Sequence, residues 1–97
     1  MPESLITLRK NIERIDAQMV RLLKKRMLLV REIGRIKKEL GLDLIDSARE
    51  SQIMERVASL PHDPIPTLQL QDLFLQIIRI SRDLQFSAAA DTSREHP

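Results

Sequence analysis

A chain of 97 residues with a net charge of +2 suits a single domain with a modest core. It has no cysteine, which excludes disulfides and thiolate metal sites, and its two histidines lie in a proline-rich stretch (His62) and near the C-terminus (His96). No run of about eighteen apolar residues and no signal-peptide pattern occurs, so we expect a cytoplasmic protein without a metal site or a membrane span.

Residues 5–40 have the pattern of one very long helix. Apolar residues recur alternately three and four positions apart, as in the a and d positions of a heptad, and no proline interrupts them. Such a helix is roughly 50 Å long, which exceeds the width of about 26 Å of a compact domain of this size. Its apolar face must therefore be covered by something longer than one ordinary neighbouring helix. The heptad positions are Leu5, Leu8, Ile12, Ile15, Met19, Leu22, Leu29, Ile33, Ile36 and Leu40.

Arg26 occupies the a position between Leu22 and Leu29, where an aliphatic side chain is expected. Desolvating a permanent charge is costly, so a buried arginine needs a partner. Arg26 could be a polar residue that sets the register of the helices, as in some coiled coils. It could instead line a cavity in which it meets an anion, and the residue alone favours neither interpretation.

The charges are unevenly distributed. Residues 1–40 carry 11 Lys and Arg against 5 Asp and Glu, whereas residues 41–97 carry 5 against 9. A basic helix can bind nucleic acid, but the chain offers no aromatic side chains there to stack on bases. We therefore interpret the basic residues as a solvated face and expect no nucleic-acid partner.

Two shorter helices follow. Ser4 or a neighbour is expected to cap the long helix, and Gly41 to end it in the left-handed conformation. A second helix should begin at Asp46–Ser47, with a Ser47–Glu50 capping box or an Asp46 cap, and end near Leu60. The segment Pro61–Pro66 cannot be helical throughout.

The third helix is expected from about Thr67 to Phe86. Its apolar stripe continues onto Ser81 and Gln85, one turn apart. Either the stripe frays there at the helix end, or the two residues line a polar pocket. From Ser87 the composition turns small and polar, and we expect residues 87–97 to form a disordered tail.

Together these polar residues describe a site with several fixed cations, a carboxylate or two, and neutral donors. It contains no nucleophile with an adjacent base, no metal cluster and no phosphate-binding glycine loop. Such a site suits a small polyanion that is held in one shape. The set comprises Arg9, Arg26, Lys37, Asp46, Arg49, Glu50, Ser81 and Gln85.

Over about residues 5–86 this pattern resembles the all-helical class of chorismate mutase. The resemblance implies an all-α fold of three helices, one very long, in an entwined homodimer with two equivalent sites. It implies a cofactor-free Claisen rearrangement of chorismate to prephenate in aromatic amino-acid biosynthesis, with residues 1–86 as the domain. The matching positions are Leu8-Arg9, Ile15-Asp16, Arg26, Gly34, Lys37, Asp46, Arg49-Glu50, Ser81 and Gln85.

By that resemblance, Arg26 and the partner chain's Arg9 bind the two substrate carboxylates, and Lys37 and Gln85 donate to the ether oxygen. Arg9 and Arg26 are 17 residues apart, or about 25 Å along a helix, too far to hold one small molecule. Arg9 must therefore serve the other subunit's site if it serves one. The resemblance assigns the ring hydroxyl to Glu50 and Asp46, a carboxylate to Ser81, and support of the binding loop to Arg49.

Two other functions compete. Isochorismate pyruvate lyase shares the fold and the cationic clamp, but the acidic pattern of Asp46 and Glu50 favours the mutase. A non-catalytic helical dimerisation or regulatory module would explain the heptad pattern. It leaves Arg26, Ser81 and Gln85 unexplained.

Overall fold

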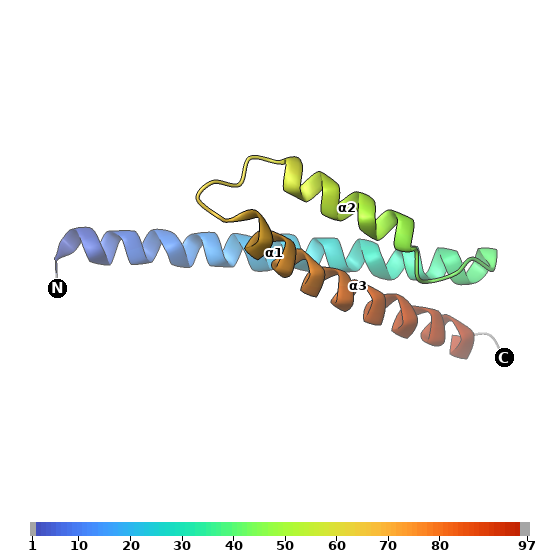
Figure 1. The fold of residues 1–97 in the computed structure, drawn as a ribbon. Helices are drawn as coiled ribbons and strands as arrows, with labels where there is room; N and C mark the ends of the chain where they lie inside the picture. The colour runs from blue at the N-terminus through green and yellow to red at the C-terminus, as the bar shows by residue number, and fades with distance from the viewer. Residues whose placement is uncertain (1, 96–97) are drawn as a thin grey trace.

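The computed structural model describes residues 2–95. These residues form three helices and no strand: α1 (Glu3–Leu40), α2 (Ser47–Ser59) and α3 (Thr67–Glu95). The predicted all-α class with three helices is confirmed. In Figure 1, α1 forms the long axis, and its N-terminal half extends beyond the other two helices.

Helix α1 is 38 residues long and ends as the glycine predicts. Gly41 has a φ of 68°, and its backbone N–H donates to the carbonyl oxygens of Lys37 and Lys38. The predicted cap at Ser4 is wrong, because the helix begins at Glu3, after Pro2. The carbonyl oxygen of Pro2 accepts the first helical hydrogen bonds, from the backbone N–H groups of Leu5 and Ile6. Proline lacks a backbone N–H but can still serve as this acceptor.

Helix α2 begins with an aspartate cap. Asp46 Oδ1 accepts a hydrogen bond of 3.0 Å from the backbone N–H of Arg49, so of the two predicted caps the structure has Asp46. The helix ends at Ser59, and residues 60–66 are non-helical up to the start of α3, as the prolines predict.

Helix α3 continues to Glu95, and the end predicted at Phe86 is wrong. Ala88 and Ala89 are buried, with 2% and 7% of their surfaces exposed. A run of alanines favours the helix intrinsically, and its small side chains fit a close helix contact. The structure describes residues 87–95 as part of α3, while residues 96 and 97 of the predicted tail lie outside the described residues.

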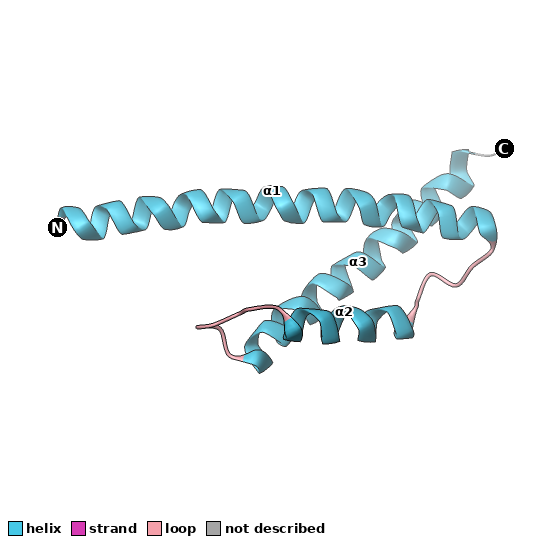
Figure 2. Ribbon diagram, turned by 90° about the horizontal axis from the view of Figure 1, so that it is seen from above, coloured by secondary structure: helices cyan, strands magenta, loops and turns pink. Residues whose placement is uncertain are grey.

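Helix α3 joins the other two. It packs against both α1 and α2, whereas within residues 2–95 no Cα atom of α1 lies within 8 Å of a Cα atom of α2. Figure 2 shows α3 running obliquely from the side of α2 to cross α1 near its C-terminal end. The buried apolar residues are few, and they are Val30, Val57, Ile78, Ala88 and Ala89.

Most of the heptad face of α1 is uncovered in a single chain. Gly34 of α1 lies against the α3 backbone at Gln85, and Val30 is buried one turn before it. The heptad positions, by contrast, range from 37% exposed at Leu5 to 67% at Leu40. The radius of gyration is 17.6 Å, against about 13 Å for a compact domain of this length. One chain therefore leaves a long apolar surface in contact with water.

Candidate active site

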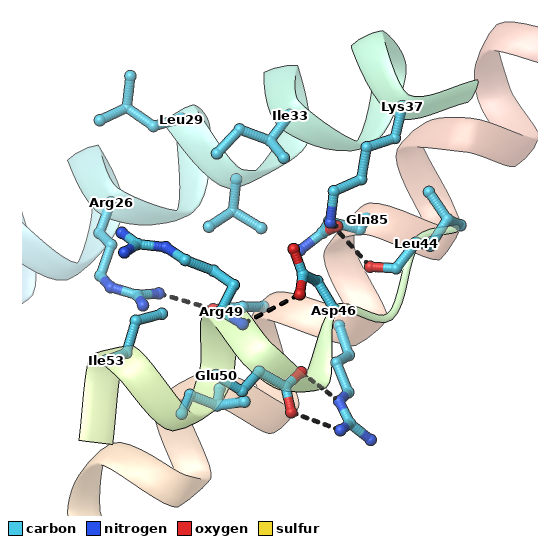
Figure 3. Close-up of a pocket in the computed structure, with 14 residues that line it drawn as sticks. Arg26, Leu29, Ile33, Lys37, Leu44, Asp46, Arg49, Glu50, Ile53 and Gln85 are labelled. Atoms are coloured by element: carbon cyan, nitrogen blue, oxygen red, sulfur yellow. Dashed lines mark hydrogen bonds and ion pairs between the residues drawn. The ribbon is translucent and has the colours of Figure 1, made fainter. Parts of the chain in front are cut away.

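A cavity of about 380 Å³ lies between α1 and α2, with α3 as its floor (Figure 3). All three helices and the α1–α2 loop contribute side chains. Apolar side chains from all three helices and the loop alternate in the lining with charged and amide groups. The lining residues are Arg26, Leu29, Val30, Ile33, Lys37, Leu44, Asp46, Arg49, Glu50, Ile53, Ile78, Ser81, Arg82 and Gln85.

At one end of the cavity Arg26 is joined to Ser81. Arg26 Nη1 donates to Ser81 Oγ at 2.7 Å, and Ser81 Oγ donates to the carbonyl oxygen of Ile77 at 2.7 Å. Ser81 as a residue is only 7% exposed, and its hydroxyl thus has both a donor and an acceptor. This contact holds the arginine stem against α3 and directs the guanidinium toward the cavity.

At the other end Lys37 is joined to Gln85. Lys37 Nζ donates to Gln85 Oε1 and to the carbonyl oxygen of Leu44, both at 2.9 Å. Because the amide oxygen faces the ammonium group, the amide NH2 of Gln85 is the part left to donate elsewhere. Within the described residues two of the three ammonium N–H groups have acceptors. Lys37 and Gln85 can therefore each offer a donor at the same place.

The α2 wall holds Glu50 in an ion pair with Arg82 of α3. Arg82 Nε donates to Glu50 Oε2 at 2.6 Å, and Nη2 donates to Oε1. This bidentate hydrogen bond lowers the pKa of Glu50 below its usual value and raises the pKa of Arg82. Glu50 is therefore ionised and fixed in orientation at neutral pH.

The cavity is positively charged. Four lining residues are cationic (Arg26, Lys37, Arg49, Arg82) and two are anionic (Asp46, Glu50), giving a formal net charge of +2. Burial lowers the pKa of Arg26, and the neighbouring Arg49 lowers it further. Figure 3 shows the Arg49 side chain extending toward Arg26. In the described part of the chain no carboxylate forms an ion pair with either guanidinium, so the cavity suits an anion.

The model of the chorismate mutase type II family matches residues 8–86. The chain belongs to this family. The matched segment contains every residue of the cavity, and α3 extends beyond it from Ser87 to Glu95.

Solved chorismate mutases share the architecture. The form II structure from Thermus thermophilus is 36% identical, with a TM-score of 0.83, and the match covers 86% of this chain and 94% of that one. The chorismate mutase of Helicobacter pylori, solved in complex with prephenate, is 26% identical with a TM-score of 0.80, covering 90% and 94%.

Curated chorismate mutase relatives match over shorter stretches. The chorismate mutase of Methanocaldococcus jannaschii is 35% identical over 60 residues, 62% of this chain and 61% of that protein. The chain spans between 16% and 61% of the length of the curated relatives that it matches.

Seven of the eight predicted chorismate mutase site residues line the cavity. The exception is Arg9, which lies on the exposed N-terminal half of α1 and outside the cavity lining. Within residues 2–95, no helix combines the length and the apolar character that a membrane span requires.

Sequence reasoning missed Arg82 and the Leu44 carbonyl. Arg82 follows Ser81 directly, and adjacent positions of a helix do not share a face, so its sequence position did not place it with the polar residues of the stripe. The Leu44 carbonyl carries no sequence signal, because every residue has one.

The lowered pKa of Glu50 predicts a pH-dependent contribution to stability. A carboxylate with a depressed folded-state pKa stabilises the fold above its ordinary pKa of about 4.3, and this is lost as the pH falls through the lowered value. Glu50→Gln should therefore reduce the free energy of unfolding at pH 7 by up to about 1 kcal/mol. The difference from wild type should be smaller at pH 3 than at pH 7.

Urea unfolding at the two pH values measures this effect. Glu55→Gln, at an exposed position on the same helix, is the control and should change stability little at either pH. An equal loss in Glu50→Gln at pH 7 and pH 3 would show that the ion pair with Arg82 does not stabilise the fold.

Proposed function

We propose that this protein is a chorismate mutase that converts chorismate to prephenate in aromatic amino-acid biosynthesis. The observation that carries the proposal is the cavity itself. Its net charge of +2 matches a dicarboxylate, and Arg26 at one end faces a paired donor site, Lys37 and Gln85, at the other. The bound prephenate in the H. pylori relative supports a product of this kind.

The reaction is a pericyclic rearrangement. The ether C–O bond of chorismate breaks as a new C–C bond forms, and no proton leaves or enters. Catalysis can therefore come from holding the reactive conformer and from donors directed at the charge that develops on the ether oxygen. Lys37 and Gln85 are those donors, and a single such donor contributes about 3–4 kcal/mol in other enzymes.

The remaining side chains orient the substrate. Arg26 binds one carboxylate with Ser81 beside it, and Arg49 extends toward the same end, so it acts as a second cation there in addition to any support of the loop. Glu50 is held by Arg82 and retains acceptor lone pairs for the ring hydroxyl, with Asp46 nearby.

The second carboxylate requires a second chain. We propose a homodimer in which the exposed heptad face of α1 packs against its copy and delivers Arg9 to the partner's cavity. The exposed heptad positions and the extended shape of one chain support this assembly.

Loss of chorismate absorbance with purified protein tests the activity. Turnover should be unchanged after dialysis against a strong chelator, because none of the proposed roles needs a metal. Prephenate should be the product, and isochorismate should be turned over far more slowly. A protein that leaves chorismate intact, or that requires an added metal or nucleotide, would refute the proposal.

A further inference from the structure

Gly34 of α1 lies directly against the backbone of α3. The residue is buried, and a Cβ atom built on it would lie 2.8 Å from both the Cα and the carbonyl oxygen of Gln85. Real Cβ contacts are essentially never so short, and the obstructing atoms are backbone, which cannot turn away as a side chain can. Only glycine allows α3 to approach α1 this closely.

Two hydrogen bonds join α1 and α3 in the cavity on either side of this approach. Lys37 lies one turn after Gly34 on α1 and reaches the amide of Gln85 at 2.9 Å. Arg26 lies about two turns before it and reaches Ser81, one turn before Gln85, at 2.7 Å. Gly34 therefore sits between both pairs, directly against the backbone of the glutamine that carries the donor.

We propose that Gly34 is a positioning residue for catalysis: it sets the separation of α1 and α3 that places the Gln85 amide beside Lys37. This inference rests on the proposed function and extends it to a residue that touches no substrate. Any side chain at residue 34 displaces the Gln85 backbone, so the amide donor moves away from the position that the ether oxygen would occupy.

Gly34→Ala is the decisive variant. Alanine is the better helix former, so α1 itself is not weakened and the defect is confined to the crossing. A misplacement of about 1 Å can cost about a hundredfold in rate. We expect kcat to fall about a hundredfold, with a much smaller change in KM, because Arg26 and Arg49 still bind the carboxylate end.

A double-mutant cycle separates positioning from general damage. In a Gln85→Ala background the amide is already absent, so adding Gly34→Ala should lower kcat by less than about threefold. Val57→Ala, a buried truncation on α2 outside the cavity lining, is the stability control. It should lower the unfolding temperature while the folded enzyme keeps its kcat.

A crystal structure of Gly34→Ala gives a readout that does not depend on activity. It should show α3 displaced at Gln85 and the hydrogen bond to Lys37 broken. If the wild-type protein fails to convert chorismate, the proposed function is refuted. The displacement of α3 in the crystal structure still tests whether Gly34 sets the separation of α1 and α3.

Unchanged kcat in Gly34→Ala, or an equal loss with and without Gln85, would overturn the inference. If the variant does not fold, Ala88→Val decides in its place, because Ala88 is only 2% exposed and lies one turn after Gln85 on α3. It should widen the same helix contact and lower kcat in wild type but not in the Gln85→Ala background. A loss in both backgrounds would overturn the inference as well.

Discussion

Replacing Arg26 with alanine is expected to lower kcat/KM about a thousandfold, while the unfolding temperature stays within about 5 °C of wild type or rises. Arg26 is partly buried, and both burial and the neighbouring Arg49 lower its pKa, so the folded protein bears an electrostatic cost for its charge. Its direct partner is a neutral hydroxyl, Ser81, which keeps its hydrogen bond to Ile77 after the truncation.

Steady-state kinetics and thermal unfolding of the same preparation measure both parts of this prediction. Arg56→Ala, at an exposed position on α2 outside the cavity lining, is the matched control and should change neither quantity appreciably. If Arg26→Ala unfolds and its folded fraction keeps full activity, Arg26 sets the register of the helices and does not bind substrate.

Mixing two inactive variants, Arg9→Ala and Gln85→Ala, is expected to restore about a quarter of wild-type activity. Each variant alone should be nearly inactive, because every site in its homodimer lacks one substrate contact. In a mixed dimer, one site takes its cavity from the Arg9→Ala chain and its arginine from the Gln85→Ala chain, so that site is intact. The other site carries both defects.

Random association of equal amounts makes about half of the dimers mixed, and half of the sites in those are intact, which gives the quarter. The two variants are unfolded together, refolded and assayed for chorismate loss, with subunit exchange verified by native mass spectrometry. Lys37→Ala mixed with Gln85→Ala is the control, since both residues line the same chain's cavity and no intact site can form. Recovery no greater than in this control would show that Arg9 does not act across the interface.

The sequence could predict those site residues that break an apolar pattern. Arg26 interrupts a heptad, and Ser81 and Gln85 continue an apolar stripe, so a polar cavity was one of two interpretations at these positions, and the structure places all three in the cavity. Gly41 and Asp46 were predictable because helix ends have strong local chemistry.

Other features depend on contacts between helices and have no local signal. Arg82 looks like any solvated helix cation until Glu50 is placed opposite it. The alanine run after Ser87 is small and polar in composition, and only the burial of Ala88 and Ala89 distinguishes it from a disordered tail. Gly34 stood out in the sequence as a glycine within a helix, but its contact with the Gln85 backbone becomes visible only when α1 and α3 cross.

The wide separation of the α1 and α2 backbones, with no Cα pair within 8 Å in residues 2–95, has a consequence for motion. The backbone of α2 packs on α3, which also holds it through the Glu50–Arg82 ion pair, so we expect α2 to move away from α1 more readily than α3 does. An anion held between Arg26 on α1 and Arg49 on α2 would tie the two helices together across the gap. Amide hydrogen exchange in α2 should then slow when the cavity is filled, and opening of α2 is the natural route for product release.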